Sequence, residues 1–298
     1  MTQRHDLVII GTGTAAMVAA MRMRAHGRTV AVVDFRPFGG TCALRGCDPK
    51  KVMVSGAETI NLARHMQGNG VEGTIHIDWP GLITFKRSFT DPIPKKHEQA
   101  YKEKGIEALH GKARFIGRNV LKVENETLEG RHFLIAAGAE PVKLGILGEE
   151  HLVRHEDFLN LQRLPRRIVL VGGGYIAAEF SHIAARGGAD VTIVQRAERL
   201  LPRFDPDLVS WLMQAFDTLA VDVRTGATVE TIEKVKSSFV VHARSNGRPA
   251  TFVADLVVHS AGRAPALGEL DLTAADVGVE MPRLKLNDFL QSVSNPAV

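Results

Sequence analysis

The sequence contains two copies of one unit: a short apolar run, a glycine-rich turn, a helix-forming stretch and a second apolar run. The first copy is LVIIGTGTAAMVAAMRMRAHGRTVAVVD at residues 7–34, and the second is IVLVGGGYIAAEFSHIAARGGADVTIVQ at residues 168–195. Apolar runs of this length are typical of strands buried on both faces of a parallel sheet. The repeat therefore predicts an α/β fold with two Rossmann-like, three-layer domains built on parallel sheets.

The two turns have the same glycine spacing. They read Gly11-x-Gly13-x-x-Ala16 and Gly172-x-Gly174-x-x-Ala177, and each copy ends 23 residues after its first glycine. The first glycine permits the tight turn, and the second lets the main chain approach a pyrophosphate at a helix N-terminus. Because both turns stand between a strand and a helix at the same offsets, we predict two dinucleotide sites.

The residues that end the two copies differ. Asp34 ends the first, and its carboxylate is suited to a ribose 2′-hydroxyl, as in the ADP moiety of FAD. Gln195 ends the second and Arg196 follows it, which favours the 2′-phosphate of NADPH over NADH. Arg199 and Arg203 are further candidates for that phosphate, and the alternative for Arg196 alone is a solvated surface arginine.

Both cysteines of the chain, Cys42 and Cys47, follow soon after Asp34. In a regular helix their Cα atoms would lie about 8–9 Å apart, and a disulfide needs less than about 7 Å. A bond between them therefore requires an irregular segment, for which Gly46 provides the freedom. The functional interpretation is a redox-active dithiol. The alternatives are a buried unpaired pair and a metal site, for which further ligands at zinc spacing are absent.

The segment GGTCALRGCDPKK, residues 39–51, resembles the active-site signature of the FAD-dependent pyridine nucleotide-disulfide oxidoreductases. Members of this family include glutathione reductase, dihydrolipoamide dehydrogenase and mercuric reductase. The resemblance extends along the chain in family order, through AAGAEP at residues 136–141, the second glycine turn and SAGRAP at residues 260–265.

The resemblance implies a mechanism and a set of site residues. NADPH reduces FAD, FAD reduces a Cys42–Cys47 disulfide, and Cys42 exchanges with a small disulfide substrate while Cys47 lies nearer the flavin. Lys50 matches a lysine near the flavin N5, and Glu179 matches its carboxylate partner. Tyr175 stands where the family often has an aromatic that covers the flavin. The remaining positions expected to bind a cofactor are Gly11, Gly13, Ala16, Asp34, Gly40, Thr41, Ala137, Gly138, Gly172, Gly174, Ile176, Arg196, Ala261, Gly262 and Arg263.

A comparison of the two repeats gives separate support for a functional role of Glu179. The equivalent position of the first copy is Val18, so an acid replaces an apolar residue on a packed helix and needs a partner. His182 and Arg186, one and two turns further on, could also face it. Asp48 departs from the usual apolar residue after the second cysteine, and we expect it to oppose formation of a thiolate.

We expect three segments: an FAD-binding domain over 1–146, an NAD(P)-binding domain over 147–265 and a partial return to the FAD domain over 266–298. Residues 111–134 suggest an antiparallel β-meander. Residues 75–104 suggest irregular chain followed by one long polar helix, and residues 239–244 and 252–259 suggest two further β-runs.

The family continues with a second FAD motif and a dimerisation domain, whose His-Glu pair supplies the proton shuttle for thiol exchange. These features are not found in the sequence. We therefore expect weaker FAD binding, slower exchange and no usual homodimer interface. The alternative to an active disulfide reductase is a front fragment or shortened remnant that binds FAD or NADPH without turnover.

Composition narrows the remaining functions. A net charge of +4, spread evenly, and the absence of nucleic-acid motifs argue against a nucleic-acid partner. The longest apolar stretch, residues 7–21, is too short to span a bilayer and contains glycines, so we expect a cytoplasmic protein without membrane or metal partners. The resemblance implies a small disulfide as the substrate, with dihydrolipoamide or mercuric ion as alternatives.

Overall fold

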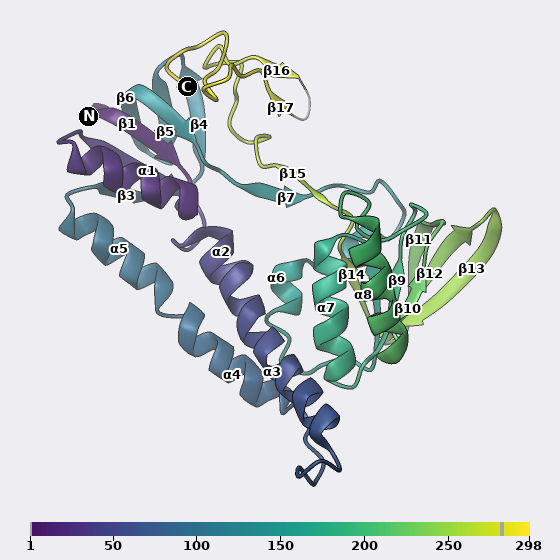
Figure 1. Ribbon diagram of the computed structural model, residues 1–298. Coiled ribbons are helices and arrows are strands. Elements are labelled where there is room, and N and C mark those ends of the chain that lie inside the picture. The colour runs from purple at the N-terminus through teal and green to yellow at the C-terminus, as the bar shows by residue number, and fades with distance from the viewer. Residues whose placement is uncertain (1, 281–282) are drawn as a thin grey trace. The chain divides into compact units, whose positions relative to one another are not determined.

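The computed structural model describes residues 2–280 and 283–298 (Figure 1). The chain forms two compact units. Unit 1 comprises Met1–Asp48, Phe89–Glu140 and Ala264–Val298, and unit 2 comprises Pro49–Ser88 and Pro141–Arg263. The predicted α/β class with parallel sheets is confirmed, because each unit holds parallel strands joined through helices.

Unit 1 is built on a six-stranded sheet with strand order β3-β2-β1-β6-β5-β4. Strands β1, β2, β3 and β6 pair in parallel, and β4, β5 and the first part of β6 form the predicted antiparallel meander. The strands are β1 (Thr2–Ile10), β2 (Val30–Asp34), β3 (Glu107–His110), β4 (Ala113–Gly117), β5 (Val120–Val123) and β6 (Glu126–Ile135). The other elements are α1 (Thr14–Ala25), α2 (Gly40–Arg45), α5 (Ile93–Glu103), β16 (Val279–Glu280) and β17 (Arg283–Leu284).

Successive side chains along the strands of unit 1 point to opposite faces of the sheet, so the unit has a core on each face. Leu7 and Ile9 point to the face covered by α1 and α5, where Ala20 and Tyr101 are fully buried. Val8 and Ile10 point to the opposite face and pack with the meander and with residues of the 270–277 segment. Unit 1 is therefore the three-layer domain that the first repeat predicts.

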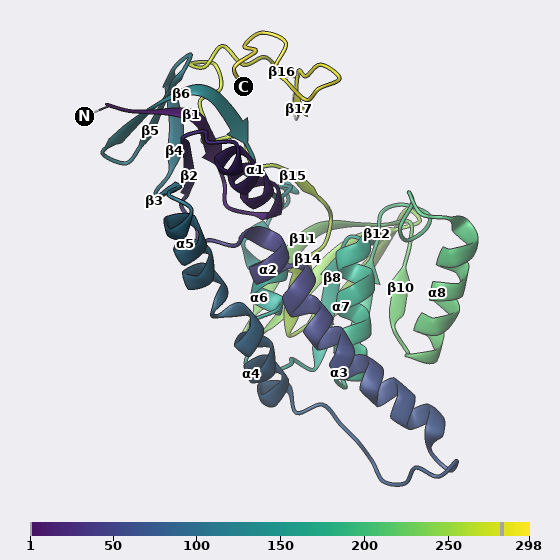
Figure 2. The same cartoon turned by 60° about the vertical axis from the view of Figure 1, so that its left-hand side comes forward.

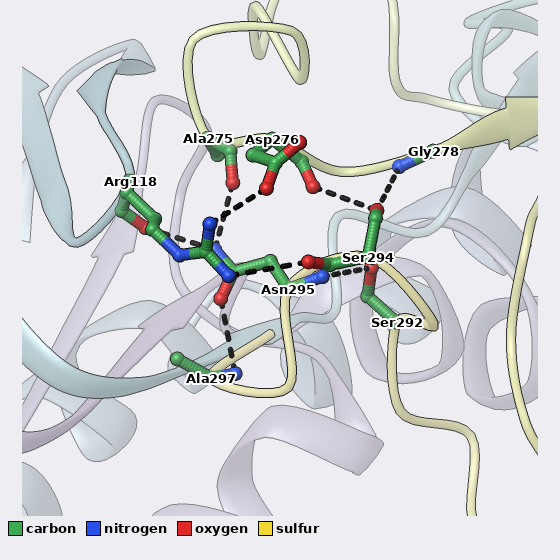
Figure 3. Close-up of polar contacts among 8 residues, drawn as sticks. All are labelled: Arg118, Ala275, Asp276, Gly278, Ser292, Ser294, Asn295 and Ala297. Carbon is green, nitrogen blue, oxygen red and sulfur yellow. Dashed lines mark hydrogen bonds and ion pairs between the residues drawn. The ribbon is translucent and has the colours of Figure 1, made fainter.

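The C-terminal residues, Ala264–Val298, belong to unit 1. Asn295 is 1% exposed, and its amide donates to the carbonyl oxygens of Arg118 and Ala275 at 3.0 and 2.7 Å (Figure 3). The Arg118 guanidinium reaches Asp276 Oδ2 at 2.7 Å, and the Ser294 hydroxyl donates to the Asp276 carbonyl at 2.7 Å. These contacts fix the last residues against the meander.

Unit 2 contains a four-stranded parallel sheet, β10-β9-β8-β14, and a three-stranded antiparallel sheet, β11-β12-β13 (Figure 2). Its sheet strands are β8 (Arg167–Val171), β9 (Asp190–Val194), β10 (Asp222–Arg224), β11 (Ala227–Val235), β12 (Ser238–Ser245), β13 (Arg248–Ala254) and β14 (Leu256–His259). Its helices are α3 (Cys47–Met66, which begins in unit 1), α4 (Trp79–Thr90), η1 (Glu149–His151), α6 (His155–Phe158), α7 (Tyr175–Arg186) and α8 (Pro206–Thr218). The short strands β7 (Ala139–Pro141) and β15 (Arg263–Pro265) stand where the chain passes between the units.

The parallel sheet of unit 2 is also covered on both faces. Ile168 and Leu170 pack against α7 and α8, together with Met53 from α3. Val169 and Val171 point the other way and pack against the antiparallel sheet. Residues 49–88 thus contribute to the core of unit 2, whereas the sequence placed them in the first domain.

Two predicted elements differ from the structure. The long helix expected within 75–104 is two helices, α4 and α5, which end and begin around Asp91 and Pro92. The β-run expected over 252–259 is divided at Asp255 between β13 and β14, which belong to different sheets. Asp255 Oδ1 accepts from Arg167 Nη2 at 2.5 Å, so its carboxylate ties the end of one sheet to the start of the other.

Candidate active site

The first glycine turn leaves no room for a side chain at Gly11. Gly11 has φ +111°, and a Cβ at this position would lie 2.2 Å from the Ala136 carbonyl oxygen. A Cβ on Gly40 would lie 2.3 Å from the Cα of Gly13. The turn is therefore packed against the segment after β6, which includes Ala137 and Gly138, and against the start of α2. Only glycine permits both approaches.

The N-terminus of α1 faces this turn with its amide groups uncapped. Gly13 is the N-cap residue, no side chain caps the helix and no acidic residue stands in its first turn. Ala16 is fully buried and lets α1 approach the strands closely. Free amide groups and the positive end of the helix dipole fit the pyrophosphate of a dinucleotide.

Asp34 lies at the end of β2 beside the turn. Its Oδ2 accepts from the Thr12 amide at 3.0 Å and from the Thr12 hydroxyl at 2.7 Å, and its Oδ1 accepts from the Arg36 amide at 2.9 Å. A carboxylate offers about four acceptor positions, so one remains for a ribose hydroxyl. This arrangement fits an ADP group with an unmodified ribose.

The second turn repeats this construction. Gly172 has φ +104°, and a Cβ there would lie 2.4 Å from the Cα of Ala261. Gly174 is the N-cap residue of α7, which also has no side-chain cap and no acid in its first turn. Unit 2 therefore presents a second pyrophosphate cradle, braced by the segment after β14.

Gln195 takes the place of Asp34 in unit 2. Its Oε1 accepts from the Gly173 amide at 3.1 Å, the same bond that Asp34 makes with Thr12, without a negative charge. Arg199, a further candidate for the phosphate, is held by its own loop: its Nη2 donates to the carbonyl oxygens of Pro202 and Phe204 at 2.7 and 3.2 Å.

A cavity of about 810 Å³ opens in front of the second turn. Tyr175, which is 54% exposed, and Ile176 lie at its wall. Among the described residues that line it, no acid occurs, whereas four are cationic: Lys143, Arg196, Arg203 and Arg263. A cavity of this size and charge suits a polyanionic nucleotide.

The dithiol lies at a junction of two helices in unit 1. Cys42 is within α2 and Cys47 is the first residue of α3, with Gly46 between the helices at φ −147° and ψ −105°. This interruption leaves the Cys47 thiol near enough to Cys42 to raise the pKa of the Cys42 thiol. Both cysteines are free thiols, with Cys42 half-buried and Cys47 exposed.

The surroundings of Cys42 favour its neutral form. The hydrogen bond with the Cys47 thiol, burial and the charges of Cys47 and Asp48 raise the pKa of the Cys42 thiol to about 11. At pH 7 only about one molecule in 10⁴ then carries the Cys42 thiolate. Attack by Cys42 on a substrate therefore needs a base, or a change at Cys47 or Asp48 that lowers the pKa of Cys42.

Cys47→Ala is expected to lower the pKa of Cys42 from about 11 towards its ordinary value of 9.0, because the main cause of the shift is removed. The rate of alkylation of Cys42 at pH 8 should rise roughly 10- to 100-fold in the reduced protein. A pH profile of iodoacetamide labelling, followed by mass spectrometry, measures this. Asp48→Asn, which removes a weaker cause, should give a smaller shift, and an unchanged profile for Cys47→Ala would contradict the assignment.

Lys50 and Glu179 form an ion pair within unit 2. Lys50 Nζ lies 2.5 Å from Glu179 Oε1, and their side chains are 17% and 31% exposed. Lys50 follows Cys47 by three residues in α3, and Glu179 lies one turn into α7. The structure thus supplies the partner that the repeat requires for Glu179.

His182 and Arg186 have other neighbours. Burial and the charge of Arg186 lower the pKa of His182, and Glu58 on α3 opposes this effect. Burial and the charge of Arg64 lower the pKa of Arg186. Both side chains therefore lie among the charged groups of α3 and α7, without an ion pair to Glu179.

Sequence reasoning missed three residues that shape these sites. Thr12 orients Asp34, Lys143 adds charge to the cavity, and His155 contacts Arg263. The repeat contained a signal only for Thr12, which directly follows Gly11. Lys143 and His155 lie in segments without a recognisable motif.

Two negative findings concern the described residues. None of the helices within residues 2–280 and 283–298 combines the length and the apolar character that crossing a membrane demands. Over the same ranges, histidine, cysteine and acidic side chains nowhere gather in groups of three or more that could hold a metal ion.

Paired glycine turns on Rossmann-like units, together with two cysteines in the unit that holds the first turn, are the arrangement typical of the disulfide reductase class of flavoproteins. A family model described as pyridine nucleotide-disulphide oxidoreductase matches residues 5–298. The chain belongs to this family, and the resemblance noted in the sequence is confirmed.

Individual relatives agree with this family. Mercuric reductase from Staphylococcus aureus is 31% identical over 296 residues, which cover 98% of this chain and 54% of that protein. Dihydrolipoyl dehydrogenase from Bacillus subtilis is 30% identical and is matched over 64% of its length by 96% of this chain.

A solved structure has the same fold. The Cu(II) complex of the HOCl-induced flavoprotein disulfide reductase RclA from Escherichia coli superposes with a TM-score of 0.87 at 26% identity, covering 99% of this chain and 65% of that one. The chain thus spans between 54% and 65% of the length of these three proteins.

Proposed function

We propose that the chain binds FAD in unit 1 and NADPH in unit 2, and that it transfers reducing equivalents to a Cys42–Cys47 disulfide for reduction of a small disulfide substrate. The observation that carries the proposal is the contrast between two cradles of one design. One ends on the carboxylate of Asp34, and the other ends on the neutral amide of Gln195 beside a cationic cavity.

The nucleotide preference follows from charge. NADPH carries a pyrophosphate and a 2′-phosphate monoester of about −1.5 to −2 charge at pH 7. Arg196 follows Gln195 directly, and Arg203 also lines the cavity. A carboxylate at the strand end would repel the 2′-phosphate, and Gln195 removes that repulsion while keeping the bond to the glycine turn.

Reduction of one substrate disulfide would consume one NADPH. NADPH and a proton reduce the Cys42–Cys47 disulfide to two thiols, and NADP⁺ leaves. FAD, when bound, supplies the chemistry that accepts hydride and passes on an electron pair. Once a base has removed its proton, the Cys42 thiolate attacks one substrate sulfur, and the other sulfur takes up a proton and leaves as a thiol. Cys47 then attacks Cys42, which releases the second thiol and restores the disulfide.

The remaining site residues position these groups. By the family resemblance, Lys50, held by Glu179 at 2.5 Å, would offer a positive charge to the electron-rich ring of FAD. The relatives that are matched include a mercuric reductase and dihydrolipoyl dehydrogenases, so dihydrolipoamide and mercuric ion stand beside a small disulfide as substrate classes.

The purified chain, reconstituted with FAD and passed through a desalting column, is expected to retain a flavin absorbance band. Anaerobic NADPH should bleach that band faster than NADH does. Flavin lost on the column under every reconstitution condition would instead support a chain that binds nucleotides without turnover. Equal bleaching by both nucleotides would contradict the NADPH preference alone.

A further inference from the structure

A buried histidine contacts one of the four cations of the cavity. Arg263 follows the Ser260–Gly262 loop after β14 and lines the cavity. Its Nη1 lies 3.2 Å from Nε2 of His155. His155 is 7% exposed and is the first residue of α6, 108 residues earlier in the chain. The contact therefore joins the cavity wall to the interior of unit 2.

The chemistry of the two side chains determines which one donates the hydrogen bond and which one accepts it. A guanidinium has donors and no acceptor, so Nε2 of His155 must offer its lone pair and the imidazole is neutral with its proton on Nδ1. Such a partner restricts the orientation of the guanidinium without adding a negative charge. A carboxylate in the same place would compete with a phosphate for the Arg263 charge, and a neutral imidazole competes less.

Hydrogen bonds that do not involve His155 hold the main chain around Arg263. The Ser260 hydroxyl lies 2.8 and 2.7 Å from the carbonyl oxygens of Val171 and Gly172, and the Val142 amide donates to the Gly262 carbonyl at 3.2 Å. His259, 6% exposed, donates from Nε2 to the Val142 carbonyl at 2.8 Å. The loop thus has its own supports, and the His155 contact acts on the Arg263 side chain.

Strand order places Arg263 and Arg196 at opposite sides of the second turn. Arg196 follows β9 and Arg263 follows β14, and β8 with its glycine turn lies between these two strands. In a Rossmann cradle the pyrophosphate sits at the turn and the ribose 2′ position faces the strand that carries Arg196. Arg263 is therefore on the side of the pyrophosphate and the nicotinamide.

We propose that His155 is a positioning residue, which orients the Arg263 guanidinium towards the pyrophosphate–nicotinamide half of the nucleotide. The proposal rests on nucleotide binding in unit 2 as proposed above. It assigns no contact between His155 and the nucleotide itself. Its effect should therefore depend on Arg263 and on the part of the nucleotide that Arg263 faces.

The test compares two probes on the full chain. His155→Leu should weaken NADPH about 5- to 10-fold, the loss of one oriented charged hydrogen bond. It should weaken adenosine 2′,5′-bisphosphate less than about 2-fold, because that probe lacks the pyrophosphate bridge and the nicotinamide. His155→Gln, whose side-chain oxygen can accept from Arg263, should recover most of the NADPH affinity.

A double-mutant cycle excludes a general structural effect. In an Arg263→Met background, His155→Leu should change NADPH affinity no further, because the group it orients is gone. Additive losses, or equal losses for both probes, would overturn the proposal, as would unaltered NADPH binding by His155→Leu. If the leucine variant does not fold, failure of His155→Gln to bind NADPH within about 3-fold of the unaltered chain would do the same.

The result also separates this inference from the proposed function. An unaltered chain that binds NADH as tightly as NADPH contradicts the NADPH assignment, and the His155 comparison is then made with NADH. An unaltered chain that binds neither nucleotide overturns both proposals.

Discussion

Arg196→Glu is expected to reverse the proposed nucleotide preference, from NADPH to NADH. The substitution removes a charge-assisted contact with the 2′-phosphate and places a carboxylate near the end of β9, where it can accept from a ribose 2′-hydroxyl. Together these effects should change the ratio of the two dissociation constants by roughly 100-fold or more, which corresponds to about 2.7 kcal/mol. Titration of each nucleotide against the purified chain measures the ratio.

A matched control separates a local contact from net charge. Arg166→Glu makes the same change in charge at an exposed position next to the start of β8, the opposite end of the strand from the glycine turn. It should leave the ratio within about 3-fold, because exposed charges at that separation are screened. An unchanged ratio in Arg196→Glu, or an equal shift in Arg166→Glu, would contradict the assignment of Arg196.

Substitution of the first glycine of each turn is expected to remove one cofactor and spare the other. In Gly11→Ala the new Cβ would lie 2.2 Å from the Ala136 carbonyl oxygen, and in Gly172→Ala it would lie 2.4 Å from the Ala261 Cα, both backbone atoms. Each turn must therefore move away from the segment that braces it. We expect FAD affinity to fall at least ~100-fold in Gly11→Ala and NADPH affinity to fall as much in Gly172→Ala.

Two other glycines provide controls for backbone strain. Gly27 and Gly188 have φ +75° and +95°, and nothing lies within 4 Å of a Cβ at either position. Alanine there imposes the left-handed conformation without a collision, at about 1–2 kcal/mol. These variants should keep both cofactors. Loss of both cofactors in either turn variant, at a temperature where the protein is folded, would contradict two separate sites.

The features that the sequence predicted well are local ones. Each glycine turn, its strands and its helix lie within 28 consecutive residues, so spacing alone specified Gly11, Gly172, Asp34 and Gln195. The interruption at Gly46 was predictable for the same reason, because two cysteines five residues apart cannot meet across a regular helix.

The features that it missed depend on distant contacts. Asp255 divides β13 from β14 through Arg167, which is 88 residues away in the sequence. Met53 of α3 shares a core cluster in unit 2 with residues of α7 such as Phe180, an association that no local pattern encodes. His155 reaches Arg263 across 108 residues, and the periodicity around either residue gives no indication of it.

The most direct test measures whether electrons from NADPH reach the sulfur atoms of Cys42 and Cys47. The FAD-loaded chain is oxidised, freed of oxidant and mixed anaerobically with one equivalent of NADPH, then quenched with iodoacetamide at alkaline pH and analysed by mass spectrometry. The account predicts carbamidomethyl groups on Cys42 and Cys47 after NADPH and on neither cysteine before it. Flavin that bleaches while both cysteines stay unlabelled, or two labelled cysteines in the oxidised chain without NADPH, would contradict it.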